Sequence, residues 1–272
     1  MQRKIAFATI AVAGLATAAS AQIRLSHNIE EFVVTAGAGV ACATRGTSAP
    51  QTTTDNLWSR SFTLADFGVT DGFDVNQVEF GVESIRLPTL IETEITVNLY
   101  QVPAGSPPIA GAPLVGSASL TTGDRALEVL TIDIDGQVDA GTALMVEVES
   151  EDLLTLAGGE TGDVFFIGGN SFGQNAPSYI ASPIGCGLPD PTDVATFGFT
   201  DSHFIIIAVG EEGGGLGVPG GPRRRRRPDD LRLPDLPEPL RRRRPAAPTS
   251  TATASLTIFD FLAFQNAFDA GC

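Results

Sequence analysis

The amino-acid sequence predicts an all-β protein built as an antiparallel β-sandwich. Apolar and polar residues alternate in segments such as RALEVLTIDIDG (125–136) and ALMVEVES (143–150), which is the period of strands buried on one face. Clusters of Gly, Pro, Asp and Asn separate such segments at intervals of eight to fifteen residues. No segment between 24 and 210 keeps the apolar repeat of a helix, so helices are not expected there.

Residues 1–21 have the pattern of a secretory signal peptide. The basic pair RK precedes an apolar run at 5–18, which is short for a membrane span, and an A-S-A cleavage signal follows at 19–21. We expect cleavage before Gln22 and a secreted protein, extracellular or at the cell surface. The alternative is a retained membrane anchor. No other stretch is long and apolar enough to span a membrane, so no span is expected after removal of the signal.

The strand patterns of the body, residues 22–210, predict a single core. DVFFIGG (163–169) and SHFIIIAVG (202–210) are short apolar runs bounded by Gly, as expected of well-buried strands. Many short strands with frequent turns favour a jelly-roll-like sandwich, and this length suffices for one core. The alternating apolar positions are Ile95, Val97 and Leu99 in 84–102, Leu127, Val129, Ile132 and Ile134 in 125–136, and Leu144, Val146 and Val148 in 143–150.

Charge is distributed unevenly along the chain. Between 22 and 217 the sequence holds five arginines and no lysine against 26 acidic residues, a net charge of −21, whereas ten arginines gather in 223–244. Such an acidic body repels nucleic acid, so no nucleic-acid partner is expected. It suits a saline or calcium-rich exterior, where ions screen its self-repulsion over about 10 Å.

Three cysteines bear on the cellular compartment. Cys42 and Cys186 lie in the Gly-rich segments GVACATRG and PIGCGLPD, and an oxidising exterior would let them form a disulfide. The alternative is two unpaired thiols. Cys272 is then the odd cysteine. Because the chain has no CxxC motif and only two histidines, no zinc site is expected.

The sequence offers no catalytic constellation, and we expect no enzyme. His203 follows Asp201 and Ser202, but residues two apart on a strand do not make a triad, and His27 stands alone. A glycosidase needs two carboxylates that flank a cleft, whereas alternating acids on strands usually form a solvated face. The pairs of this kind are Glu92/Glu94, Asp133/Asp135 and Glu147/Glu149.

Three stretches of the body are NLWSRSFTLADFGV (56–69), VEFGVES (78–84) and PSYIASPIGCGLPDPTDVATFGF (177–199). They resemble a β-sandwich module of secreted, modular bacterial surface proteins that end in sorting or anchoring signals. Four aromatic residues are expected to pack in the core or in loops, as such residues more often do, and the alternative is a platform on which sugars stack. They are Trp58, Phe62, Tyr100 and Tyr179.

Residues 211–248 are expected to form a disordered linker, because prolines interrupt regular elements and the arginine runs repel one another. The last segment, 249–272, ends in SLTIFDFLAFQNAFDAGC, with apolar residues at helical spacing over 256–268. We expect at most a short helix remnant there.

The end of the chain resembles the second half of a dockerin repeat, a calcium loop followed by a helix, in the variety that ends in Gly-Cys. With Asp260 at the twelfth loop position, Ser255 takes the seventh, where a backbone carbonyl binds calcium, and Thr257 takes the ninth. The resemblance implies Ca²⁺ in an intact tail and docking to a cohesin-type or surface-sorting receptor. It departs at TSTATA (249–254), where the family carries Asp-x-Asp-Gly-Asp-Gly, so the chain as written is expected to hold no calcium.

A shift of reading frame accounts for this departure. PTSTATA (248–254) can be encoded as CCG ACT TCG ACG GCG ACG GCN, which reads Asp-Phe-Asp-Gly-Asp-Gly from the third base onward. Likewise, 218–245 can be read out of frame as CPADLDGDGALTIFDFLTFQNLFDAGDP, a complete first repeat. We therefore interpret 211–248 as a linker that contains an out-of-frame first repeat, and 249–272 as the remnant of the second.

These features predict a secreted, non-catalytic β-sandwich of the cell surface or extracellular space, attached through a dockerin-like module. Two alternatives stay open. One is a carbohydrate-binding accessory module with a polysaccharide partner, which a glycan array would detect. The other is a secreted polysaccharide hydrolase, which requires paired acids that converge in one cleft.

Overall fold

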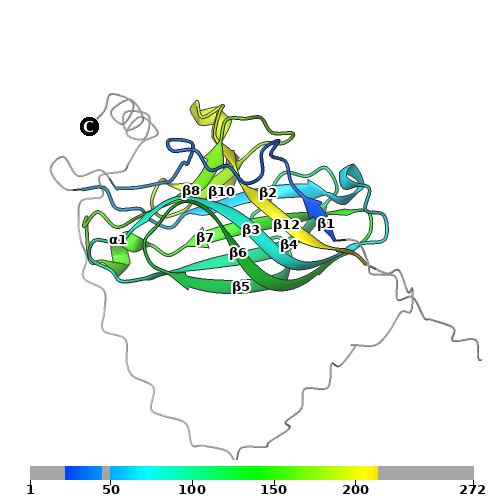
Figure 1. The fold of residues 1–272 in the computed structure, drawn as a ribbon, viewed down its shortest axis with the longest axis horizontal. Helices are drawn as coiled ribbons and strands as arrows, with labels where there is room; N and C mark the ends of the chain where they lie inside the picture. Colours follow the sequence, from blue (N-terminus) through cyan, green and yellow to red (C-terminus); the bar gives the residue numbers. More distant parts are fainter. Residues whose placement is uncertain (1–21, 45–49, 214–272) are drawn as a thin grey trace, which may run out of the picture.

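The computed structural model describes residues 22–44 and 50–213 (Figure 1). Two antiparallel six-stranded sheets contain nearly all of its regular structure, and the expected all-β sandwich is confirmed. The expected signal segment and the dockerin-like remnant, with Asp260, Thr257 and Ser255, lie outside the described residues, as does nearly all of the expected linker. None of the described helices is long and apolar enough to cross a membrane.

The first sheet contains β1 (Ile23–Leu25), β3 (Phe73–Arg86), β6 (Arg125–Val138), β8 (Val164–Asn170), β11 (His203–Phe204) and β12 (Ile206–Glu212). The long strand β3 organises it. The first half of β3 pairs with β12, the second half pairs with β8, and the opposite edge pairs with β6 along nearly the whole length. β1 and β11 extend the sheet beyond β12 and β8.

β12 continues past residue 210, where the sequence places the end of the body. Its last residue, Glu212, pairs with Phe73 on β3. The Glu212 carboxylate also accepts hydrogen bonds from the backbone N–H groups of Thr70 at 2.6 Å and Asp71 at 3.1 Å. These contacts hold the end of the strand in the sheet, although Gly and Glu are poor strand formers by composition.

The second sheet contains β2 (Leu57–Thr63), β4 (Thr93–Pro103), β5 (Leu114–Thr122), β7 (Thr142–Ser150), β9 (Tyr179–Ser182) and β10 (Leu188–Asp193). Their order is β10-β9-β2-β7-β4-β5. A tight turn after β5 carries the chain across to β6 in the first sheet. Three short helical turns connect strands: η1 (Leu64–Phe67), α1 (Leu153–Leu156) and η2 (Val194–Phe197).

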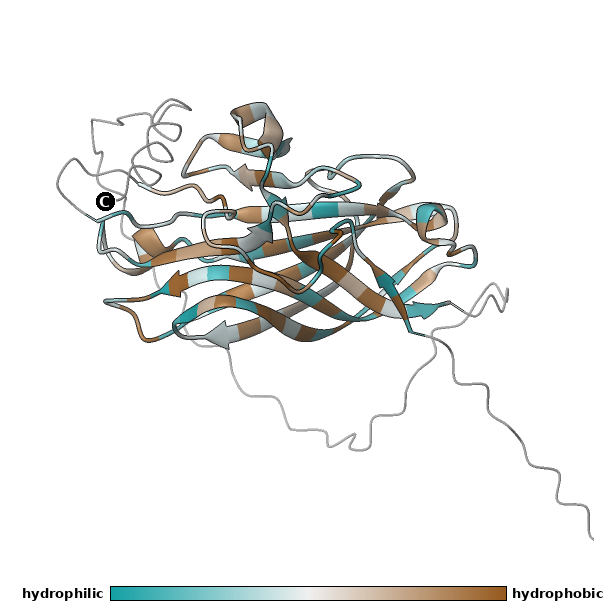
Figure 2. Ribbon diagram, turned by 45° about the horizontal axis from the view of Figure 1, so that its top comes forward, coloured by the Kyte–Doolittle hydropathy of each residue, from teal (hydrophilic) through white to brown (hydrophobic). Residues whose placement is uncertain are grey.

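The core lies between the two sheets, and Figure 2 shows hydrophobic and hydrophilic residues following one another along the strands. On β2 the inward residues include Trp58 and Phe62, both fully buried. Most of the alternating positions expected from the sequence belong to this core. They are Ile95, Val97, Leu99, Ile132, Ile134, Leu144, Val146 and Val148.

The start of β6 departs from the expected alternation. Leu127 is 51% exposed and has a φ of 52°, a left-handed conformation unusual for leucine. Val129 packs outside the main core, against a small cluster that includes Ile207 and Val209 of β12. β12 is therefore buried on both faces, which explains why its sequence is a continuous apolar run rather than an alternating one.

Candidate functional site

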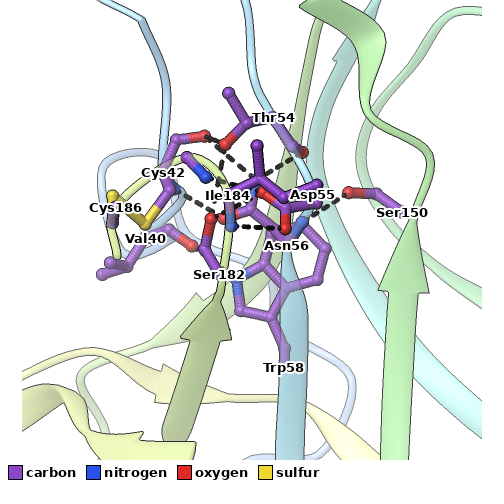
Figure 3. Close-up of a disulfide and its surroundings, with 11 residues drawn as sticks. Val40, Cys42, Thr54, Asp55, Asn56, Trp58, Ser150, Ser182, Ile184 and Cys186 are labelled. Carbon is purple, nitrogen blue, oxygen red and sulfur yellow. Dashed lines mark hydrogen bonds between the residues drawn. A yellow bond between two sulfur atoms is a disulfide. The ribbon is translucent and has the colours of Figure 1, made fainter. Parts of the chain in front are cut away.

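A disulfide fastens two distant parts of the chain. Cys42 and Cys186 are bonded, with their Cα atoms 5.8 Å apart, so the predicted pair is confirmed (Figure 3). Cys42 belongs to the segment that precedes β2, and Cys186 lies in the turn between β9 and β10. The bond thereby ties the N-terminal segment to one edge of the second sheet.

Hydrogen bonds place both ends of the disulfide. The Asn56 side chain accepts from the Cys42 N–H at 2.6 Å and donates to the Cys42 carbonyl at 3.0 Å. The Asp55 carboxylate accepts from the backbone N–H groups of Ile184 at 2.9 Å and Gly185 at 2.8 Å, in the turn that carries Cys186. Figure 3 shows both side chains beside the disulfide. The side chains of Asn56 and Asp55 therefore hold the backbone on both sides of the disulfide in place, independently of the S–S bond.

Trp58 belongs to the same region and does not form a sugar platform. Its indole N–H donates to the Val40 carbonyl at 2.6 Å, and its ring packs edge-on against Phe165 with centroids 4.9 Å apart. Phe62 is equally buried, so the expected core packing is confirmed for these two rings and the sugar-platform alternative is excluded for them. Tyr100 and Tyr179 are only partly buried and remain candidates.

Both histidines are largely buried and make contacts within the fold. His203 accepts a hydrogen bond on Nδ1 from the Gly173 N–H at 3.1 Å, and its Nε2 lies 3.3 Å from the Thr200 carbonyl. This arrangement favours a neutral ring with its proton on Nε2. Burial lowers the pKa of His203 and also that of His27, which stacks on Phe62 with centroids 4.8 Å apart.

Asp201 and Ser202, which precede His203 in the sequence, line an open pocket that does not include His203. They belong to the wall of an open pocket of about 280 Å³, together with residues 35–38 and 198–200. His203 is not part of that wall, and its two ring nitrogens are engaged elsewhere. The structure therefore does not bring these three residues together as a catalytic group.

Arg60 is a buried cation that sequence reasoning missed. It is fully buried between Trp58 and Phe62 on the inner side of β2, and it donates to the carbonyls of Ala176 at 2.9 Å and Phe204 at 2.7 Å. Its Nε has no hydrogen-bond partner among the described residues. Burial lowers its pKa to about 9. The alternating pattern W-S-R-S-F (58–62) could have revealed this burial, since it places Arg60 on the same side of the strand as Trp58 and Phe62.

The acidic pairs separate into solvated and recessed groups. Glu92, Glu94, Asp133 and Asp135 are exposed, as a solvated face predicts. Glu147 is only 7% exposed, so that expectation is wrong for this residue. Its surroundings on the outer side of the second sheet are therefore the strongest candidate for a functional site.

Glu147 is part of a hydrogen-bonded network on β4, β5 and β7. The Tyr100 hydroxyl donates to Glu147 Oε1 at 2.9 Å. Asn98 donates from Nδ2 to Glu149 Oε2 at 3.2 Å and accepts on Oδ1 from the Ser117 hydroxyl at 2.8 Å. Burial raises the pKa of Glu147, while the Tyr100 hydrogen bond acts against this shift. Burial and the nearby Glu147 charge raise the pKa of Tyr100.

This network offers hydrogen-bonding groups but no evident metal site. Among residues 22–44 and 50–213, no group of three or more His, Cys, Asp or Glu side chains is placed to hold a metal ion. The calcium positions expected from the sequence fall in the tail, outside this part of the chain. Two carboxylates, an amide and a phenol on one sheet face can instead bind a ligand rich in hydroxyl groups.

Comparison with known proteins adds little to this geometry. No protein-family model matches the chain, and no curated protein matches it. Among solved structures, a clostridial cysteine protease after propeptide cleavage aligns with a TM-score of 0.41 and 12% identity, over 59% of this chain and 37% of that chain. The chain thus spans little more than a third of that protein's length, and a likeness this weak says nothing about function.

Proposed function

We propose that this chain is an exported, non-catalytic β-sandwich protein of the cell surface or extracellular space. The observation that carries the proposal is the Cys42–Cys186 disulfide, which joins residues 144 positions apart and sits within its own hydrogen-bond network. Such bonds persist in oxidising compartments and are rare in the cytosol. The signal-type pattern at 1–21 and the acidic, lysine-free body support the same compartment.

Export is tested by expressing the chain with and without residues 1–21 in a bacterium that processes N-terminal signals. The full chain should leave the cytosol with the mass of a protein that begins at Gln22. A reductant applied under denaturing conditions should add the mass of two hydrogen atoms. A secreted product that retains residues 1–21, or alkylation of both Cys42 and Cys186 without denaturant, would contradict the proposal.

The proposal includes attachment through the C-terminal dockerin-like module in its frame-corrected form. That module would bind Ca²⁺ and dock to a cohesin-type or surface-sorting receptor. In the chain as written, Thr249, Thr251 and Thr253 stand where the restored loop has aspartates. Neutral hydroxyls replace charged oxygen ligands poorly, so the written tail should bind no calcium.

Two peptides test this attachment, one with the written sequence of 211–272 and one encoded by the frame-corrected DNA. Circular dichroism with calcium should show a rise in helicity for the corrected peptide alone, and a chelator should reverse it. A calcium response of the written peptide, or none of the corrected one, would count against the module. The nucleotide sequence of the gene decides whether the frame shifts exist.

A further inference from the structure

We propose that the outer side of the second sheet binds an uncharged polysaccharide. The inference rests on the extracellular function proposed above and names a ligand class for that module. The residues concerned lie on four neighbouring strands and are called the Glu147 face. They are Ser59, Asn98, Tyr100, Glu147, Glu149 and Tyr179.

Strand pairing brings one row of this face into register. Tyr179 on β9 pairs with Ser59 on β2, Ser59 pairs with Glu147 on β7, and Glu147 pairs with Asn98 on β4. Because neighbouring strands lie about 4.8 Å apart, the row spans about 15 Å across the sheet. A row of this length suits several sugar units of a polysaccharide better than one small molecule.

The neighbours of Ser59 on β2 establish which side this row faces. The Trp58 indole lies in the core, and the Arg60 guanidinium reaches inward to the Phe204 carbonyl of the first sheet. Since successive side chains of a strand point to opposite faces, Ser59 points outward. Its register partners Glu147 and Tyr179 share that side.

Several polar groups on the Glu147 face are withdrawn from water. Exposure is 1% for Ser59, 7% for Glu147 and 9% for Asn98. The Ser59 hydroxyl also has no hydrogen-bond partner among the described residues. Buried hydroxyls in folded proteins are usually paired, so an unpaired one beside a recessed carboxylate points to a partner from outside the chain, which neighbouring side chains on this face must move to admit.

The chemistry of this face matches a sugar. Tyr100 and Tyr179 present partly buried rings with polar tips, against which the apolar side of a sugar ring can pack. Carboxylate oxygens accept hydrogen bonds from sugar hydroxyls, and the Asn98 amide is already oriented by Ser117 and Glu149. Groups held by neighbouring hydrogen bonds need little rearrangement on binding.

The negative charge of this face favours uncharged polysaccharides over anionic ones. Arg60 is the one basic residue in the strands of the second sheet, and it points into the core. A uronate or sulfate group on the outer side would therefore meet Glu147 and Glu149, and none of the described strands of this sheet offers it a cation there. Like charges at this distance oppose binding.

Affinity electrophoresis of the oxidised, mature full chain tests the inference. Native gels contain hydroxyethylcellulose, glucomannan, galactomannan or laminarin, with a polysaccharide-free gel as reference. Anionic polysaccharides are omitted, because the arginine runs at 223–244 would retain them whatever the Glu147 face does. We expect retardation in at least one gel, weakened at least tenfold by Glu149→Gln and by Tyr179→Ala. The control Glu211→Gln, an exposed change on β12, should leave it unchanged.

The outcomes separate the polysaccharide site from the function on which it rests. Free migration of the wild-type chain in every gel, or equal retention of the Glu149→Gln variant and wild type, overturns the site but leaves export and attachment intact. Release of reducing ends from a retained polysaccharide, abolished by Glu147→Gln, supports the site and overturns the non-catalytic function. Thermal unfolding of each variant verifies that binding is lost from a folded protein.

Discussion

Removing the disulfide is the perturbation with the largest expected effect on stability. The double variant Cys42→Ser, Cys186→Ser opens a cross-link between residues 144 positions apart. In the chain-entropy treatment, a loop of this length contributes about 5 kcal/mol at 25 °C by restricting the unfolded chain. For a body of this size, each kcal/mol shifts the midpoint of thermal unfolding by about 2–4 °C, so a fall of about 10–20 °C is expected.

The variant should nevertheless keep its native fold. The Asn56 amide continues to hold residue 42, and the Asp55 carboxylate continues to hold the backbone of Ile184 and Gly185. The loss should therefore arise mainly from the unfolded state, with circular dichroism of the native protein unchanged.

Scanning calorimetry and urea unfolding of the oxidised wild type and the double variant measure the effect. Cys272→Ser is the matched control, because it removes a thiol without touching the Cys42–Cys186 bond. A loss of less than about 1 kcal/mol, in wild-type protein whose mass confirms the bond, would refute the chain-entropy reasoning.

Three further predictions concern backbone and protonation. Gly168→Ala should lower the free energy of unfolding by about 3 kcal/mol in urea titrations, because a Cβ there would lie 2.6 Å from backbone atoms of β3. The control Gly213→Ala should change little, because its Cβ would lie 3.5 Å from the nearest atom, the Asp71 carbonyl oxygen. Leu127→Val should be about 1–2 kcal/mol less stable than Leu127→Gly in the same assay, since β-branched residues tolerate a positive φ poorly; equal stabilities would argue against strain at this position. Because burial lowers the pKa values of His27 and His203, the unfolded chain takes up protons below about pH 6.5 before the folded one does, so stability should fall as the pH drops through that value. In urea titrations at a series of pH values, the double variant His27→Gln, His203→Gln should lose less stability than the wild type below about pH 6.5. An unchanged slope would show that the two histidines do not cause the loss.

Local pattern predicts most of the strands. The alternation in ALMVEVES corresponds to β7, because a strand buried on one face needs apolar residues at every second position. The same rule fails at Leu127, where the backbone turns to a positive φ and the side chain faces solvent. It also fails beyond residue 210, where pairing with β3 keeps Gly210 to Glu212 in the sheet despite their composition.

The candidate site was hidden from the sequence for a different reason. Alternation separates the two faces of a strand, but it does not reveal which positions along one face are covered. Glu147 and Glu149 have the same local pattern, yet Glu147 is recessed beside Tyr100 while Glu149 is exposed. The difference depends on neighbours from β2 and β4, which lie far away in the sequence.

The sequence by itself determined the strand content, the acidic and lysine-free body, and the pair of cysteines suited to a disulfide. Only the tertiary structure decided that Trp58 and Phe62 belong to the core while Tyr100 and Tyr179 lie toward the outer side. It also decided that Arg60 is buried and donates to backbone carbonyls, with no salt bridge to a carboxylate among residues 22–44 and 50–213. Composition and periodicity are local properties of the chain. Sheet order and the packing of one sheet on the other are set by contacts between distant segments, and those contacts decide which side chains meet.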